Sequence, residues 1–160
     1  KVLKETKCDA VKLEGGAKII NQVKVLIKNK IPVLGHLGLL PQANKGKFKS
    51  KGKTTREIKK LFSDALLLQK AGVFAIVLEC VKTPIAKQIT KDLNIPTIGI
   101  GSSVHCDGQV LVTDDLLGLN ETKIKFVKKY LNIKKYINLG LKKYASDVKS
   151  KKYPSKKHSY

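Results

Sequence analysis

Four side chains suited to acid–base or metal chemistry stand at or near the ends of apolar segments: Lys12, Glu14, His36 and Glu79. Glu79 is the only charged residue in the apolar run 73–80. A carboxylate that loses solvation has a raised pKa and becomes usable as a general base. The alternative is a structural role for Glu79, which would cap the next helix or pair with a lysine. This segment alone favours neither.

The other three side chains would complete a site for proton abstraction next to a carbonyl. Glu14 could bind a hard cation such as Mg²⁺ through oxygen, and Lys12 could neutralise a substrate carboxylate. A metal would then stabilise the enolate. Each residue also has a structural alternative: Lys12 as one more surface lysine, Glu14 as a cap for the following helix, and His36 as a hydrogen-bonded core histidine.

Alternating strands and helices must position these residues. We predict strands at 9–14, 32–35, 73–80, 96–101 and 109–112, and helices at 17–29, 54–71, 84–93, 123–131 and 134–149. The second helix begins with a capping box, Thr54 to Glu57, and ends at Gly72; Pro84 opens the third. Residues 38–53 form a long loop of the length typical of binding loops. This alternation is typical of parallel strands whose functional ends share one edge.

Five strands are too few to close a barrel of eight, which needs roughly 250 residues. The sequence also lacks methionine, including at position 1. We therefore predict that residues 1–160 are the C-terminal part of a single (β/α)8 TIM barrel domain, with the N-terminal strands outside this sequence and a polar tail at 151–160. An independent, five-stranded doubly wound domain is the alternative fold.

The amino-acid composition limits which partners we expect. The formal charge is +21, but Arg56 is the only arginine, and base readout and phosphate clamps favour arginine. We therefore expect no specific nucleic-acid partner, although a basic nucleic-acid-binding domain remains the second hypothesis. No apolar run is long enough to span a bilayer, and no signal peptide is visible, so we expect no membrane association.

The cysteines point to a reducing compartment. Cys8, Cys80 and Cys106 are odd in number and far apart, which indicates neither a disulfide framework nor a CxxC site. We therefore expect a cytoplasmic protein. Cys106 lies between His105 and Asp107, but adjacent residues lack the spacing of a zinc site.

Five longer motifs occur in order along the chain: VKLEGG at 11–16, PVLGHLGL at 32–39 followed by Pro41-Gln42, FAIVLEC at 74–80, IPTIGIG at 95–101, and CDGQVLV at 106–112 followed by DLLG at 115–118. Together they closely resemble ketopantoate hydroxymethyltransferase. The resemblance implies a TIM barrel of the phosphoenolpyruvate/pyruvate-like superfamily, cytoplasmic and commonly decameric. The implied reaction transfers a hydroxymethyl group from 5,10-methylenetetrahydrofolate to 3-methyl-2-oxobutanoate, giving 2-dehydropantoate for pantothenate and coenzyme A synthesis.

The resemblance also implies roles for individual residues. Glu79 resembles the proton acceptor, Lys12 the lysine that binds the keto acid, and Glu14 a ligand of Mg²⁺. His36 resembles a pocket histidine that supports substrate binding. The two metal-binding aspartates of the family lie upstream of Lys1, so we expect this segment alone to be inactive. A lyase of the same superfamily acting on another 2-oxo acid is a third hypothesis.

Overall fold

The computed structural model describes residues 5–42, 49–121 and 124–160. It divides into two compact units, Lys1–Val110 and Leu111–Tyr160, which are described separately below. The prediction that residues 1–160 form part of a single barrel domain remains a prediction. No helix among the described residues is both long and apolar enough to cross a membrane.

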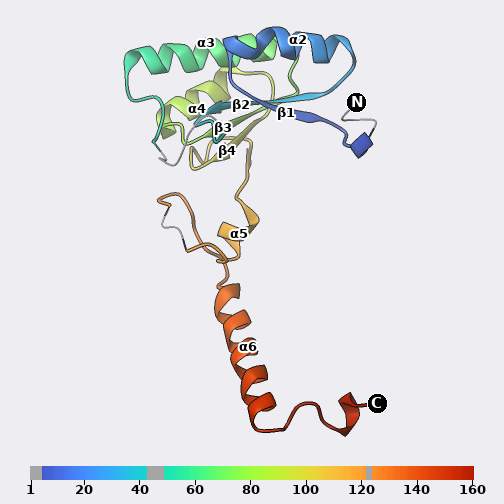
Figure 1. Cartoon of the computed structure of the whole chain (residues 1–160). Coiled ribbons are helices and arrows are strands. Elements are labelled where there is room, and N and C mark those ends of the chain that lie inside the picture. Colours follow the sequence, from blue (N-terminus) through green and yellow to red (C-terminus); the bar gives the residue numbers. More distant parts are fainter. Residues whose placement is uncertain (1–4, 43–48, 122–123) are drawn as a thin grey trace. The chain divides into compact units, whose positions relative to one another are not determined.

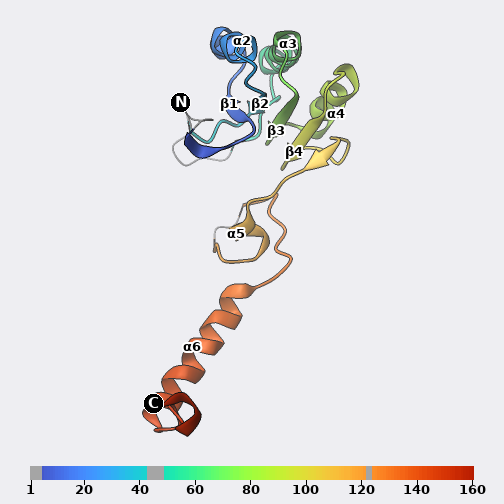
Figure 2. The ribbon, with the colours of Figure 1, turned by 90° about the vertical axis from the view of Figure 1, so that its right-hand side faces the viewer.

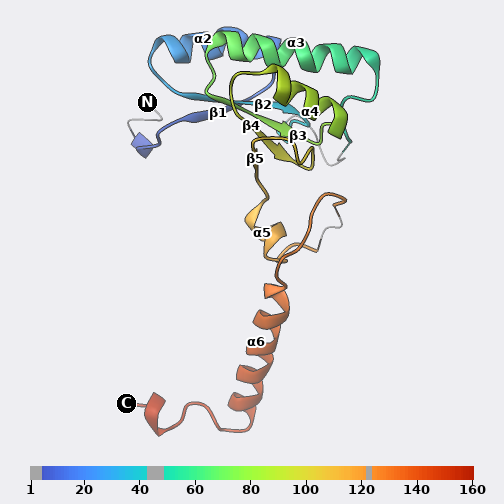
Figure 3. The same cartoon turned by 180° about the vertical axis from the view of Figure 1, so that it is seen from behind.

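The first unit is built on one parallel sheet, whose strands lie in the order in which they occur along the chain. The middle strands are the most buried, as expected for a parallel sheet, and every residue of the third is buried. The five strands, seen from opposite sides in Figures 1 and 3, are β1 (Val11–Glu14), β2 (Val33–Gly38), β3 (Ala75–Glu79), β4 (Thr97–Ile100) and β5 (Gly108–Gln109).

The helices of this unit are the short 3-10 helix η1 (Ala17–Ile19), α2 (Ile20–Lys28), α3 (Thr55–Ala71) and α4 (Thr83–Asp92). Helices α2, α3 and α4 cover the same face of the sheet, as the end-on view in Figure 2 shows. A doubly wound domain has helices on both faces of its sheet and a reversal in strand order. The first unit has neither feature, so the doubly wound alternative is wrong for the described residues.

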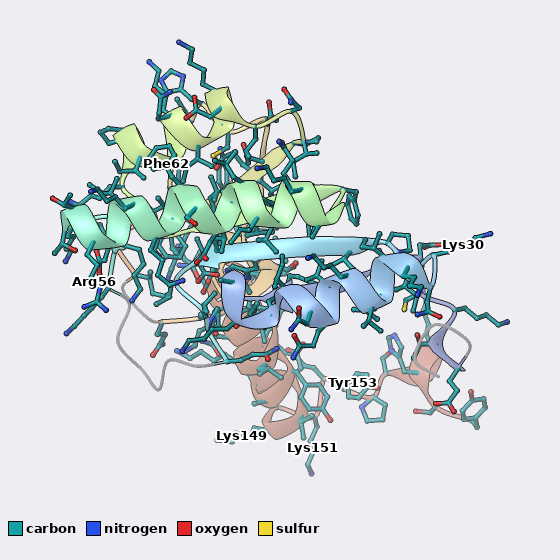
Figure 4. All side chains as sticks on the ribbon, turned by 90° about the horizontal axis from the view of Figure 1, so that it is seen from above. Lys30, Arg56, Phe62, Lys149, Lys151 and Tyr153 are labelled. Atoms are coloured by element: carbon teal, nitrogen blue, oxygen red, sulfur yellow. The ribbon has the colours of Figure 1, made fainter. Side chains whose placement is uncertain are left out.

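The core fills the space between the helices and the sheet. Leu68 on α3 and Ile76 on β3 are fully buried at its centre, with Val23 from α2 and Ile89 from α4 beside them. Figure 4 shows the same layer from the helix side: Phe62 lies on the side of α3 nearer α4, while Arg56 and Lys30 project outward at opposite ends of the helix pair. The core therefore lies on the helix-covered face of the sheet.

Local signals define the ends of α3 as predicted. Thr54 is the N-cap, and its hydroxyl accepts the backbone N–H of Glu57 at 3.2 Å. The Glu57 carboxylate reaches further back than in a standard capping box and accepts the N–H groups of Gly52 and Lys53, which lowers the pKa of Glu57. Gly72 ends the helix in the left-handed region at φ 94°.

The second unit contains α5 (Thr113–Leu116), α6 (Ile133–Lys149) and η2 (Lys156–His158). The predicted helix at 123–131 is wrong: residues 124–131 are irregular, and 122–123 lie outside the described residues. The backbone N–H groups of Tyr130 and Leu131 both point to the carbonyl of Leu116 and so make no helical bonds. The predicted strand at 109–112 is also too long, because Val112 is already the N-cap of α5.

Candidate functional site

Strand alternation places the four predicted site residues on one face of the sheet. In β1, Val11 and Leu13 pack against the core, so Lys12 and Glu14 face the opposite way. In β3, Ile76 and Leu78 belong to the core, which turns Glu79 to the same opposite face. The side chains predicted to do chemistry therefore lie on the face that no described helix of the first unit covers.

Strand register brings three of these residues into a row. Glu14 is paired with His36 across β1 and β2, and Gly38 with Glu79 across β2 and β3. His36 therefore lies between the two glutamates, directly beside one and diagonal to the other. Its Nε2 is 3.2 Å from Oε2 of Glu79, and its Nδ1 is 4.0 Å from Oε1 of Glu14. The prediction that these side chains share one edge is confirmed for all three.

His36 is the most buried member of the row, with 1% of its surface exposed. Burial lowers the pKa of His36, and the positive charge of Lys12 lowers it further, although Glu14 opposes both effects. Neither ring nitrogen has an aligned hydrogen bond among the described residues. The carboxylate of Glu79, 3.2 Å from Nε2, is close enough to partner the ring, so the choice between a pocket histidine and a hydrogen-bonded core histidine stays a prediction.

Glu79 has the environment expected of a general base. It is 6% exposed, and burial raises its pKa. Glu14 raises the pKa further by charge repulsion, while the ammonium group of Lys12 lowers it. The N-cap of α4 is Lys82, with no side-chain capping bond, so Glu79 does not cap the following helix. Its carboxylate faces His36 instead.

The backbone around Glu79 is fixed by the turn that follows β2. Gly38 has φ 98°, and Leu39 donates its N–H to the Glu79 carbonyl at 2.8 Å. A Cβ at position 38 would lie 2.1 Å from that same carbonyl oxygen. Only glycine fits here, because the conformation and the close approach both exclude a side chain. Gly38 thus sets the position of the strand end that carries Glu79.

The predicted long loop is tied to the same strand end on its far side. Lys51 donates its N–H to the Cys80 carbonyl at 2.8 Å, and its own carbonyl accepts the N–H of Lys82 at 3.0 Å. Residues 43–48 of the loop lie outside the described residues. The two described ends of the loop therefore meet at the carboxyl edge of β3, beside Glu79.

Glu14 is suited to supply one oxygen ligand to a divalent cation. Its Oε2 accepts the backbone N–H of Gln42 at 3.2 Å, and the carboxylate keeps further acceptor capacity. Mg²⁺ is commonly held by one or two carboxylates, with water and substrate oxygens completing its shell. The described parts of the chain contain no group of three or more His, Cys, Asp or Glu side chains that could hold a metal. Glu14 therefore fits such a site as a single ligand.

One buried carboxylate beside the turn that follows β1 was not predicted. Asp64 is 5% exposed in the middle of α3, and it accepts the backbone N–H of Ala17 at 3.0 Å, three residues after Glu14. A signal was present in the sequence: Asp64 lies on the apolar stripe of its helix, between Leu61 and Leu68. A charged residue on such a stripe indicates a specific buried partner.

Comparison with known proteins gives a consistent result. The family model described as "Ketopantoate hydroxymethyltransferase" matches residues 1–156. Proteins named "3-methyl-2-oxobutanoate hydroxymethyltransferase" are 61% identical over 160 residues in Pelagibacter ubique and 50% identical over 163 in Acetivibrio thermocellus, each alignment covering 100% of this chain. In Saccharolobus solfataricus the identity is 49% over 152 residues, or 94% of the chain. The chain spans 62%, 58% and 57% of the length of these relatives.

Proposed function

Because the chain belongs to the ketopantoate hydroxymethyltransferase family, we propose that it carries part of the active site of a 3-methyl-2-oxobutanoate hydroxymethyltransferase. The reaction transfers a one-carbon unit from 5,10-methylenetetrahydrofolate to 3-methyl-2-oxobutanoate, and 2-dehydropantoate is the product. The observation that carries this proposal is the row of Glu14, His36 and Glu79 along one edge of the parallel sheet.

Glu79 acts as the proton acceptor. It removes the proton from the carbon next to the keto group, and the electron pair left behind forms the enolate. That carbon then bonds to the methylene carbon of the folate, both C–N bonds of the methylene carbon break, and one water supplies the hydroxyl oxygen. Tetrahydrofolate leaves, and its two nitrogens take up the proton held by Glu79 and one proton from the water. The raised pKa of Glu79 supports this role, because a more basic carboxylate is a better acceptor for a weakly acidic proton.

Lys12 and His36 bind and orient the keto acid. Lys12 is exposed on the same sheet face as Glu79, and its ammonium charge matches the substrate carboxylate. His36 is neutral when its pKa is lowered, so it can donate one hydrogen bond without adding charge. Its position 3.2 Å from Glu79 suits a supporting role in which it orients both the base and the substrate.

Glu14 would be a ligand of the Mg²⁺ that the family resemblance implies. When bound, the cation stabilises the negative charge that develops on the keto oxygen. Glu14 contributes one carboxylate oxygen, while the backbone N–H of Gln42 holds its other oxygen in place.

The same proposal extends to the fold and the assembly. Five parallel strands in sequential order, with helices on one face only, support a (β/α)8 TIM barrel in which the row faces the interior. We also assign a cytoplasmic location and a homo-oligomer, decameric by analogy with the family. Sedimentation of the protein at its full natural length tests the oligomer.

Replacing Glu79 by glutamine in the protein at its full natural length tests the central assignment. Glutamine keeps the volume and polarity of the side chain but cannot accept the proton. We expect turnover to fall by about 10²–10⁴-fold, the usual contribution of a positioned general base. Exchange of the substrate C3 proton for deuterium, followed by NMR in D₂O, should fall by a similar factor because it reports proton removal alone.

Glu5→Gln is the matched control, since Glu5 is an exposed carboxylate outside the row. It should leave turnover and proton exchange unchanged. Near wild-type proton exchange in Glu79→Gln would refute the role of Glu79 as the base. If Glu79→Gln kept deuterium exchange at C3 but lost hydroxymethyl transfer, Glu79 would act in a step after proton removal. If the wild-type protein exchanged the protons of another 2-oxo acid faster than those of 3-methyl-2-oxobutanoate, the result would favour a related lyase.

A further inference from the structure

The turn that carries Glu14 is built on two adjacent glycines. Gly15 has φ 125° and donates its N–H to the carbonyl of His36 at 3.0 Å. Gly16 follows it with φ −114° and ψ −119°. Two glycines in a row leave a chain with many accessible conformations. Something must therefore select the one conformation in which Glu14 faces His36.

Asp64, on α3, fixes the conformation of this turn. Its Oδ1 accepts the N–H of Ala17 at 3.0 Å, and its Oδ2 is 2.6 Å from Nζ of Lys60. Gly16 is the N-cap of η1 and has no side chain that could form a capping bond. The carboxylate of Asp64, on α3, takes this capping role instead. The turn is thus held at both ends, by His36 before Gly16 and by Asp64 after it.

Packing makes the arrangement specific. A Cβ on residue 16 would lie 2.0 Å from Cγ of Asp64 and 2.3 Å from its Oδ2. The carboxylate therefore occupies the space where a side chain of residue 16 would be. Asp64 contacts the turn through both a hydrogen bond and direct packing, so the backbone cannot move toward α3.

We infer that Asp64 is a positioning residue for Glu14: it holds the Gly15-Gly16 turn so that the Glu14 carboxylate is presented at the row with His36. Asp64 acts only through the backbone and does not meet the substrate. The inference rests on the proposed function, in which Glu14 ligates a divalent cation. A purely structural role would predict lower stability with unchanged cation binding.

The test uses Asp64→Leu, which keeps the branching of the side chain but replaces both acceptor oxygens with somewhat larger methyl groups. Mn²⁺ serves as the probe, and its binding to the protein at full natural length is measured by the loss of the free-ion EPR signal. Changes in the partners that orient metal ligands commonly weaken metal binding 10–100-fold. We expect Asp64→Leu to raise the dissociation constant for Mn²⁺ by about 10-fold. Asp64→Asn, which retains one acceptor oxygen, should bind closer to wild type.

Asp107→Leu is the matched control. The Asp107 carboxylate also accepts a backbone N–H, from Thr97 at 2.8 Å, but it does so at the amino end of β4. It should lower the melting temperature without changing Mn²⁺ binding. If Asp64→Leu gives too little folded protein, Asp64→Ala removes the same oxygens with no added volume against Gly16.

Two outcomes separate this inference from the proposed function. If Glu14→Gln weakens Mn²⁺ binding and the Asp64 variants bind as wild type, the positioning role is overturned and the metal role of Glu14 stands. If Glu14→Gln itself binds Mn²⁺ as wild type, the metal assignment and the positioning role both fail. Weakened binding in Asp64→Leu, restored in Asp64→Asn, supports the inference.

Discussion

Replacing Gly38 by alanine should damage both the stability of the protein and the placement of Glu79. The residue stands at φ 98°, where side chains are disfavoured. The added Cβ would lie 2.1 Å from the Glu79 carbonyl oxygen and 2.8 Å from Cγ2 of Val81. Because the first of these contacts is with backbone, no rotation of a side chain can relieve it.

The expected size of the effect follows from these contacts. Forcing a residue with a side chain into the left-handed region costs about 1–2 kcal/mol. The hydrogen bond from Leu39 to the Glu79 carbonyl must also lengthen, at a further cost of about 0.5–1.5 kcal/mol. The sum is roughly 1.5–3.5 kcal/mol, and the melting temperature should therefore fall by roughly 3–14 °C. Turnover should fall as well, since the end of β3 moves away from His36.

Thermal unfolding and the turnover assay, run together on Gly38→Ala, measure both effects. Gly140→Ala is the matched control: Gly140 lies within α6, and an added Cβ would meet no atom of the other described residues within 4 Å beyond its neighbours in the helix. Alanine there should stabilise the protein by about 0.5–1 kcal/mol and leave turnover unchanged. A Gly38→Ala variant with wild-type stability and turnover would refute the claim that this turn holds Glu79 in place.

Two further predictions follow from the raised pKa values at the end of β3. Because burial raises the pKa of Glu79, this carboxyl group loses its proton at a lower pH in the unfolded state than in the folded state. The free energy of unfolding therefore falls as pH rises from about 4.5 to the raised pKa of the folded state. Glu79→Gln should therefore unfold at a higher temperature than wild type at neutral pH, and this difference should vanish below about pH 4; a difference independent of pH would contradict it. Burial also raises the pKa of Cys80 to about 11, so iodoacetamide at pH 8 should label the half-buried Cys8 first, as read by peptide mass spectrometry. Faster labelling of Cys80 than of Cys8 would contradict this prediction.

The parts of the fold set by local chemistry could be predicted from the sequence. Thr54 and Gly72 mark the ends of α3 because capping depends on a few neighbouring residues. The placement of Glu79 at a strand end follows from a buried apolar run of strand length. The failure at residues 124–131 has a long-range cause: the Leu116 carbonyl takes the backbone donors of Tyr130 and Leu131. Apolar periodicity carries no information about such a competitor.

For the site, the sequence predicted that the residues lie at strand ends, but not which of them would be neighbours. That His36 would lie between the two carboxylates depends on strand register, which pairs it with Glu14 on β1 and places Glu79 two residues beyond its partner on β3. The buried contact of Asp64 with Gly16 depends on how α3 packs over the start of α2, and no spacing within α3 determines that.

The row is assembled at the expense of stability, and this limits which substitutions the protein can accept there. Burial lowers the pKa of His36 and raises the pKa of Glu79. Both arrangements disfavour the folded state, and they persist because rigid elements on either side hold them. Those elements are glycine turns in which the space for a side chain is filled by another group, Asp64 at Gly16 and the Glu79 carbonyl at Gly38. A substitution that relaxes the row should therefore stabilise the fold and weaken catalysis, whereas one that fills a glycine turn should weaken both.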